Sequence, residues 1–286
     1  MKDEPTQIHV AGTGLRGSGY PNATATLRLL RGMPGVVVHD RARWLPEGTV
    51  LWRKAQRAGS ALPFLAKLAF LNALEAIRIR PLVRRRNALV YAPYPAVFML
   101  WWLSWLPRRM RPRVVADAYV SLWDAAFRDR NKAGGGVAGR VAKWFEARAL
   151  RAAWCVLVDT TANKDWYVSG FGVSPERIRA IPLALELPAS PPQPAPMPAA
   201  PPLRVLYFGT LVPLHGVRVI AEAVRQLGKG GAPVEFTFIG DGQDGAALEG
   251  LLASQDGVRV CWHRQWHSLD ELVSRIQKAH VCLGVF

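Results

Sequence analysis

The chain has 286 residues, of which 50% are hydrophobic and 20% are charged, and this composition excludes a disordered or collagen-like protein. The length predicts two domains with hydrophobic cores of their own. Lysine and arginine outnumber aspartate and glutamate by 37 to 21, which gives a formal charge of +16. All of this excess lies in residues 1–190, so an anionic partner is expected to bind the N-terminal half.

Short β-branched runs alternate with helical patterns along the N-terminal half, which is typical of a parallel α/β sheet. A glycine-rich loop follows the first of these strands. In chain order, the patterns predict strand Ile8–Ala11, helix Asn22–Arg31, strand Val36–His39, helix Ala61–Ile79, and strands Ala88–Tyr91, Arg113–Ala116 and Trp154–Val158.

Residues 188–202 hold eight prolines in fifteen positions and predict an extended linker, which separates a domain at about residues 6–187 from a second at 203–286. The second domain is predicted to contain strand Leu203–Phe208, helix Val217–Leu227, strand Val234–Ile239, helix Asp244–Ala253, strand Val258–Cys261, helix Leu269–Gln277 and strand His280–Phe286. Two doubly wound, Rossmann-like units are therefore expected, with a cleft where the carboxyl ends of their strands face each other. The chain stops on the apolar run VCLGVF, so we expect the second unit to be incomplete.

A Gly-x-Gly-x-x-Gly sequence, Gly12 to Gly17, follows the first predicted strand and precedes a helix. Glycines let the backbone approach a diphosphate, and the helix N-terminus supplies amide donors. Asp40 ends the next strand at a spacing that fits a nicotinamide or flavin dinucleotide site. An NAD(P)- or FAD-dependent oxidoreductase is therefore one candidate, and a glycine turn that only reverses the chain is the alternative.

The second domain repeats this arrangement, because glycines follow its first two strands in the sequences GTLVPLHG (209–216) and GDG (240–242). Small residues at strand ends leave room for a ligand above the sheet edge. No Gly-Lys-Ser/Thr is present, so neither turn is a Walker loop.

Two long segments resemble the retaining GT-B glycosyltransferases of the family 4-like group, which use nucleotide sugars and have two Rossmann-like domains. FGTLVPLHGVRVIAEAVRQL, FTFIGDGQ and SLDELVSRIQKAHVCLGVF resemble the start of the donor domain, and WFEARALRAAWCVLVDTTANKDWYVSGFGVSPERIRAIPLALE resembles the end of the acceptor domain. The resemblance implies transfer of a sugar from a nucleoside diphosphate to a saccharide or lipid-linked acceptor in cell-envelope polysaccharide synthesis. Further donor-site elements of the family would follow Phe286, so we expect this chain alone to be inactive.

The resemblance implies donor binding by the two sets of glycine turns. In the family, cations on the second-domain turn hold the diphosphate, and this chain has Thr210 and His215 at those places. The expected donor-binding residues are Gly14, Gly17, Gly19, Gly209, Thr210, His215, Gly216, Gly240 and Gly242.

Polar residues after strand Arg113–Ala116 are the candidate catalytic groups: Asp117, Tyr119 and Asp124. The family often has a histidine near the position of Tyr119. The leaving diphosphate is thought to act as the base, so the protein mainly stabilises charge. Asp117 capping the next turn is an equally open interpretation. Asp-x-Asp is absent, so no metal or other cofactor is expected.

Residues 53–113 contain 13 basic side chains and one acid, Glu75. Within this stretch, Ala88–Pro107 is uncharged for 20 residues, but Pro93 and Pro95 leave a helix of about 12 residues that is too short to span a bilayer. Tryptophan beside arginine suits an anionic membrane surface, and a core helix with a solvated basic tail is the alternative. The expected membrane residues are Arg84, Arg85, Arg86, Trp101, Trp102, Trp105, Arg108 and Arg109. No nucleic-acid motif is present, so nucleic acid is not expected as a partner.

Three cysteines beside apolar runs predict buried thiols in a reducing compartment, and MKDEPTQ predicts no secretory signal. We therefore expect a cytoplasmic protein that binds peripherally to the inner membrane face. Besides the oxidoreductase, a non-catalytic basic module that binds lipid or nucleic acid remains a rival interpretation.

Overall fold

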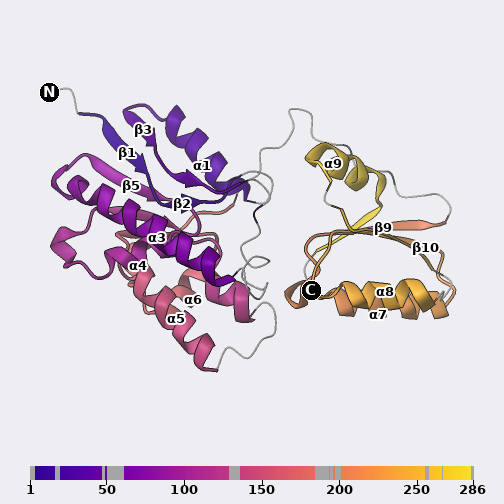
Figure 1. Cartoon of the computed structure of the whole chain (residues 1–286). Helices are drawn as coiled ribbons and strands as arrows, with labels where there is room; N and C mark the ends of the chain where they lie inside the picture. Colours follow the sequence, from indigo (N-terminus) through magenta and orange to yellow (C-terminus); the bar gives the residue numbers. More distant parts are fainter. Residues whose placement is uncertain are drawn as a thin grey trace. The chain divides into compact units, whose positions relative to one another are not determined.

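The computed structural model describes residues 4–16, 20–46, 49, 61–128, 136–183, 193, 196, 201–254, 258–265 and 267–284. Two compact units are present (Figure 1). The linker predicted at 188–202 lies almost entirely outside the described residues, so its boundaries stay a prediction.

The first unit contains a six-stranded parallel sheet in the order β3-β1-β5-β6-β7-β8. Its strands are β1 (Thr6–Val10), β3 (Val36–Asp40), β5 (Ala88–Ala92), β6 (Val114–Asp117), β7 (Cys155–Val158) and β8 (Ile178–Ala180). Two short strands after β1 and β3, β2 (Thr13–Gly14) and β4 (Arg43–Trp44), pair with each other. Consequently the chain leaves β1 and β3 side by side before it enters the helices.

The helices of the first unit divide between the two faces of the sheet. They are α1 (Pro21–Gly32), α3 (Ala61–Ile79), α4 (Val97–Leu103), α5 (Val137–Leu150) and α6 (Thr161–Phe171). Short helical turns are η1 (Arg80–Arg84), η2 (Arg108–Met110), η3 (Asp124–Arg128) and η4 (Pro175–Arg177). Right-handed crossovers place α1 on one face and α3 to α6 on the other, because the order reverses after β3 (Figure 1).

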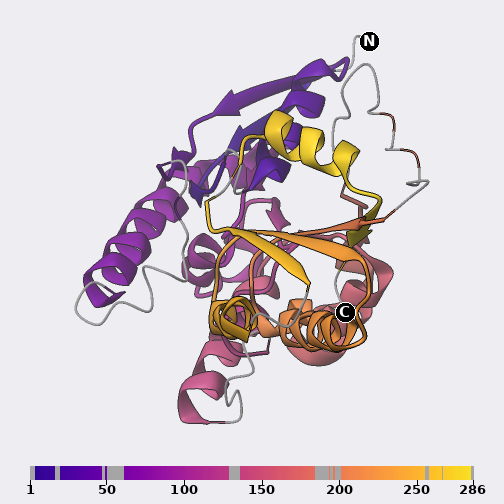
Figure 2. The same ribbon diagram turned by 90° about the vertical axis from the view of Figure 1, so that its right-hand side faces the viewer.

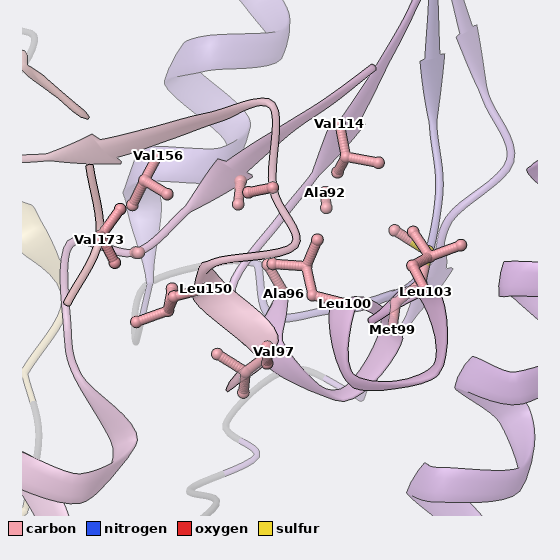
Figure 3. Packing of buried hydrophobic residues seen from close by; sticks show 14 of the residues in the cluster. Ala92, Ala96, Val97, Met99, Leu100, Leu103, Val114, Leu150, Val156 and Val173 are labelled. Carbon is pink, nitrogen blue, oxygen red and sulfur yellow. The ribbon is translucent and has the colours of Figure 1, made fainter. Parts of the chain in front are cut away.

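The core of the first unit lies between β5–β7 and the helices α4 and α5 (Figure 3). Leu100 and Leu103 of α4 and Leu150 of α5 pack toward Val114 and Val156 of the sheet, and each is at most 1% exposed. Complete burial of such a side chain stabilises the fold by about 1.5–3 kcal/mol. The predicted 12-residue helix over this core is only seven residues long in α4.

The second unit contains a four-stranded parallel sheet in the order β11-β10-β9-β12. Its elements are β9 (Leu203–Phe208), η5 (Pro213–His215), α7 (Val217–Lys229), β10 (Val234–Ile239), α8 (Gly245–Ser254), β11 (Arg259–His263), α9 (Leu269–Lys278) and β12 (Val281–Leu283). Helices α7 and α8 cover one face, and α9 covers the other (Figure 2). Both units are thus parallel α/β sheets, and the predicted fold class is confirmed.

One sequence expectation about the cysteines is wrong. Cys155 on β7 is half-buried, whereas Cys261 on β11 and Cys282 on β12 are exposed. Among the described residues, these last two strands are the two edges of the second sheet. A strand's place in the sheet depends on the order of pairing, which an apolar run in the sequence does not reveal.

Candidate functional site

The carboxyl edge of the second sheet is built from backbone packed on backbone. The amide of Gly209 donates to the carbonyl of Ile239 (3.0 Å), and that of Leu211 donates to the carbonyl of Asp241 (3.2 Å). A Cβ on Gly240, where φ is +128°, would lie 2.0 Å from the oxygen of Gly209. A Cβ on Gly242 would lie 2.4 Å from the oxygen of Leu211. Glycine is therefore required at both positions because the two loops touch through their main chains.

His215 is fixed by the turn that precedes α7. Its Nδ1 donates to the carbonyl oxygen of Thr210 (2.7 Å), and the hydroxyl of Tyr207 lies 3.4 Å from the same nitrogen. Because Nδ1 carries a proton, Nε2 accepts in the neutral ring and donates in the charged one. Gly216, with φ of +64°, then leads the chain into α7. His215 therefore has a set orientation beside the positive end of the α7 dipole, where anions are favoured.

A cation that sequence reasoning missed lies in the first turn of α7. The Nε of Arg218 donates to Oδ1 of Asp244 (3.0 Å), which follows β10 at the same sheet edge. The Asp244 side chain is 0% exposed, whereas that of Arg218 is 73% exposed. A buried carboxylate thus holds an open guanidinium next to the loops. Its position two residues after Gly216 is the sequence signal that could have identified it.

The glycine loop of the first unit is filled by side chains. Gly14 is buried, and a Cβ there would lie 2.6 Å from Pro93 Cγ and 2.8 Å from Trp44 Cζ3. Asn72 of α3 accepts from the amide of Thr13 (3.2 Å) and donates to its hydroxyl (2.8 Å). Glycine at position 14 is explained by this packing. Gly17 and Gly19 lie outside the described residues.

Asp40 ends β3, as the dinucleotide interpretation requires, but its carboxylate already has partners. Trp44 Nε1 donates to it at 3.2 Å, and Arg31 forms an ion pair with it at 3.3 Å. The amide of Ala42 donates to it as well (3.3 Å). These contacts bend the chain from β3 into β4.

Asp117 ends β6 as a buried carboxylate that is 1% exposed. The hydroxyls of Tyr20 (2.7 Å) and Tyr91 (3.2 Å) donate to it. Desolvation by burial raises the pKa of Asp117 to about 6, although these hydrogen bonds oppose the shift. Tyr119 lies two residues on, 9% exposed, and burial raises its pKa to about 12. Asp117 therefore joins the start of α1 to the end of β6.

The partly buried Asp124 and the buried Glu146 hold the loop that follows β6. Trp166 Nε1 donates to Asp124 (2.8 Å), and Arg128 lies 3.6 Å from its other oxygen. Glu146 of α5 accepts from the amides of Leu122 (2.9 Å) and Trp123 (2.7 Å). Burial raises the pKa of Glu146 to about 7. Sequence reasoning missed Glu146; its only signal is a single acid in the amphipathic segment of α5.

The expected membrane residues lie on η1, α4 and η2 of the first unit or directly after them. Arg84 ends η1, Arg85 and Arg86 follow it, Trp101 and Trp102 lie on α4, Trp105 follows α4, and Arg108 and Arg109 begin η2. Within the described parts of the chain, no helix is long and apolar enough to cross a bilayer. The same residues contain no group of three or more His, Cys, Asp or Glu side chains that could hold a metal ion.

The fold resembles that of several solved glycosyltransferases. The lipopolysaccharide outer core galactosyltransferase WaaB, in its apo form, matches with a TM-score of 0.59 and 15% identity over 97% of this chain and 73% of its own. Anabaena HepE in complex with UDP and glucose matches with a TM-score of 0.50 and 16% identity over the same shares. TarM matches with a TM-score of 0.51 and 11% identity over 76% of this chain and 39% of its own.

A scan against protein-family models found no match, and a search of curated proteins found none either. The structural likenesses therefore establish the fold, which is that of the GT-B glycosyltransferases with their Rossmann-like units.

Proposed function

We propose that this protein is a family 4-like, retaining glycosyltransferase that takes a sugar from a nucleoside diphosphate. The observation that carries the proposal is the carboxyl edge of the second sheet, where His215 and Arg218 stand at the N-terminal end of α7. A helix N-terminus with two potential cations suits a diphosphate. The fold it shares with HepE, whose structure holds UDP and glucose, supports the same assignment.

In this proposal the second unit stabilises the negative charge that grows on the leaving diphosphate. The α7 amides, His215 Nε2 and the Arg218 guanidinium are its donors, and the buried Asp244 keeps the guanidinium in place. Gly209, Thr210, Gly216, Gly240 and Gly242 form the surrounding loops. No metal is assigned a role, since these groups supply the positive charge.

The first unit is proposed to hold the acceptor, a saccharide or lipid-linked saccharide of the cell envelope, at the cytoplasmic membrane face. Tyr119 and Asp124, which follow β6, are the candidate groups for the reacting hydroxyl. Asp117 is too buried for that role and is proposed to position Tyr20 and Tyr91. Gly14 is likewise assigned to packing rather than to the donor.

Calorimetric titration of the chain with UDP, UDP-sugars, GDP-sugars and NADH tests the proposal. We expect binding of a nucleoside diphosphate, weakened at least about tenfold by Arg218→Ser or by His215→Phe, since a charge-assisted hydrogen bond contributes about 1.5–3 kcal/mol. Arg259→Ser, which removes a surface arginine on β11 that is 82% exposed, is the matched control. Where turnover is seen, the anomeric configuration of the product by NMR tests retention.

Two results would replace the proposal. Tight NADH binding that Asp40→Ala abolishes would favour the oxidoreductase, despite the hydrogen bonds that already occupy Asp40. Failure to bind any nucleotide, together with binding of lipid or nucleic acid, would favour a non-catalytic basic module.

A further inference from the structure

An apolar face extends across three helices of the first unit. On α3, Phe70 and Ile77 are 63% and 62% exposed, and their spacing of seven residues puts them on one side of the helix. Trp102 of α4 is 41% exposed, and its Nε1 donates to the carbonyl of Ala69 on α3 (2.9 Å). The exposed surfaces of α3 and α4 are therefore continuous.

The same face continues onto α5 through packed indole rings. The ring of Trp101 lies 5.6 Å from that of Trp105 and 5.1 Å from that of Trp144 on α5. Trp105 is 59% exposed, Trp144 51% and Val141 57%. We call Phe70, Ile77, Trp102, Trp105, Val141 and Trp144 the aromatic face. Monomeric soluble proteins rarely expose so many large apolar side chains together, so this face is expected to have a partner.

Arginines border the aromatic face at the amino edge of the sheet. Arg84 to Arg86 precede β5 and Arg108 and Arg109 precede β6, and the turns η1 and η2 that carry them lie next to each other. All five side chains are exposed, and none forms an ion pair with a residue in the described part of the chain. Arg148 lies over the ring of Trp105 at 4.0 Å.

No acidic side chain on these segments offsets this charge. Glu75, the one acid of residues 53–113, is 1% exposed and pairs with Arg43 and Arg78. Glu146 of α5 is 2% exposed and accepts hydrogen bonds from Ser121 to Trp123. The exposed charge around the aromatic face is therefore positive, which excludes a basic partner.

We infer that the aromatic face and its five bordering arginines bind the surface of a bilayer that contains anionic lipid. Indole rings favour the headgroup region, where their apolar bodies leave water, and arginines pair with lipid phosphates. This inference rests on the proposed function, which places the protein at a membrane surface, and it identifies the side chains that contact the lipid. Vesicle binding needs no sugar donor, so its failure is separate from failure of nucleotide binding.

Co-sedimentation of the full chain with vesicles tests the inference, using phosphatidylcholine alone and phosphatidylcholine mixed with phosphatidylglycerol. We expect binding to the mixed vesicles only, weakened by salt. Each arginine near an anionic surface contributes about fivefold to the partition coefficient, so replacing Arg84, Arg85 and Arg86 by Ser is expected to lower it roughly a hundredfold. The matched control replaces three second-unit arginines, Arg225, Arg259 and Arg264, by Ser, and is expected to leave binding unchanged.

A second pair of variants tests the apolar part. Phe70→Ser combined with Ile77→Ser is expected to lower vesicle binding at least tenfold, because both apolar side chains leave water when the protein binds the membrane surface. Val219→Ser combined with Leu269→Ser, at positions 66% and 65% exposed in the second unit, is the control and is expected to have no effect. Circular dichroism of each variant checks the fold.

Three results would overturn the inference. The first is equal binding to neutral and anionic vesicles, and the second is an equal loss in the test and control variants. The third is a dimer or a complex with RNA that the Phe70→Ser and Ile77→Ser pair disrupts while vesicle binding stays absent, which would assign the face to that partner.

Discussion

The carboxyl edges of the two sheets carry similar glycine turns but are closed in different ways. In the first unit, side chains close the edge: Trp44 and Pro93 cover Gly14, and Tyr20 and Tyr91 enclose Asp117. In the second unit, main chain meets main chain at Gly209 and Gly240, and the polar groups of His215 and Arg218 stay partly or largely exposed. A glycine motif thus marks a close approach without saying what approaches, and at the second edge the side chains of His215 and Arg218 remain accessible to a ligand.

The largest effect is expected where backbone touches backbone. Gly240→Ala places a Cβ 2.0 Å from a main-chain oxygen, in a conformation with φ of +128°. Strain and overpacking together are expected to lower the free energy of unfolding of the second unit by about 3–5 kcal/mol. Hydrogen exchange of the β9 and β10 amides would measure it. Gly250→Ala on α8, where a Cβ meets nothing within 4 Å, is the control; a similar cost in both would contradict the backbone contact.

The buried Asp117 predicts a pH dependence that belongs to the first unit. Its pKa of about 6 in the folded protein lies above the ordinary value of 3.8, so its contribution to stability is present below pH 4 and is lost as pH rises through 6. The difference between these two pKa values corresponds to about 3 kcal/mol of stability. Urea unfolding of the wild type and Asp117→Asn across pH 4–8 would measure the difference. Parallel curves would contradict the raised pKa.

Gly14→Ala is expected to cost less than Gly240→Ala, because its added Cβ meets the side chains of Pro93 and Trp44 rather than a main-chain oxygen. The Pro93 ring is held to the backbone but Trp44 can shift, so we expect a loss of about 1–3 kcal/mol. The Trp44→Leu background is expected to reduce that cost, and a double-mutant cycle would show the coupling. Gly32→Ala, with nothing within 4 Å of its Cβ, is the control. An uncoupled cycle would argue against a role for Trp44 in requiring glycine.

The smallest effect is expected from Tyr207, whose hydroxyl only supports the turn before α7. Tyr207→Phe removes its 3.3 Å hydrogen bond to the carbonyl of Thr210 and is expected to cost about 1 kcal/mol. Tyr20→Phe removes the 2.7 Å hydrogen bond to the buried Asp117 carboxylate, whose Oδ1 keeps the longer hydrogen bond from the amide of Tyr119 (3.4 Å), and is expected to cost about 1.5–3 kcal/mol. Thermal unfolding of both variants would compare them. An equal loss of stability in both variants would contradict the expectation that side-chain hydrogen bonds contribute more at the first edge than at the second.

The sequence predicted the fold well, because alternation of β-branched runs and helical patterns depends on neighbouring residues. β9, β10 and α7 lie within two residues of the expected ranges, and Asp117, Gly209 and Gly240 lie at or directly after strand ends as expected. Pairing between distant strands was beyond such reasoning, and so was the exposure of Cys261 and Cys282 on the edge strands.

The candidate sites were harder to predict because partners far apart in the sequence decide them. Asp117 meets Tyr20 across 97 positions, and Thr13 meets Asn72 across 59. Arg218 is held in place by Asp244, and Glu146 binds the amides of Leu122 and Trp123; both sets of contacts join residues far apart in the sequence. Residue type and local spacing identified the places where ligands could bind. They did not show which polar groups already form hydrogen bonds within the protein.

The exposed position of Cys261 on an edge strand allows a fluorescent dye to be attached to a native residue. Cys261 and Cys282 are both exposed residues, but partial desolvation raises the pKa of the Cys282 thiol, as burial does for the half-buried Cys155, and lowers their thiolate fractions. A maleimide dye at limiting concentration is therefore expected to attach first to Cys261, on the strand next to β10. Because the first unit contributes only the half-buried Cys155, the fluorescence of that dye would report changes in the second unit without any engineered residue.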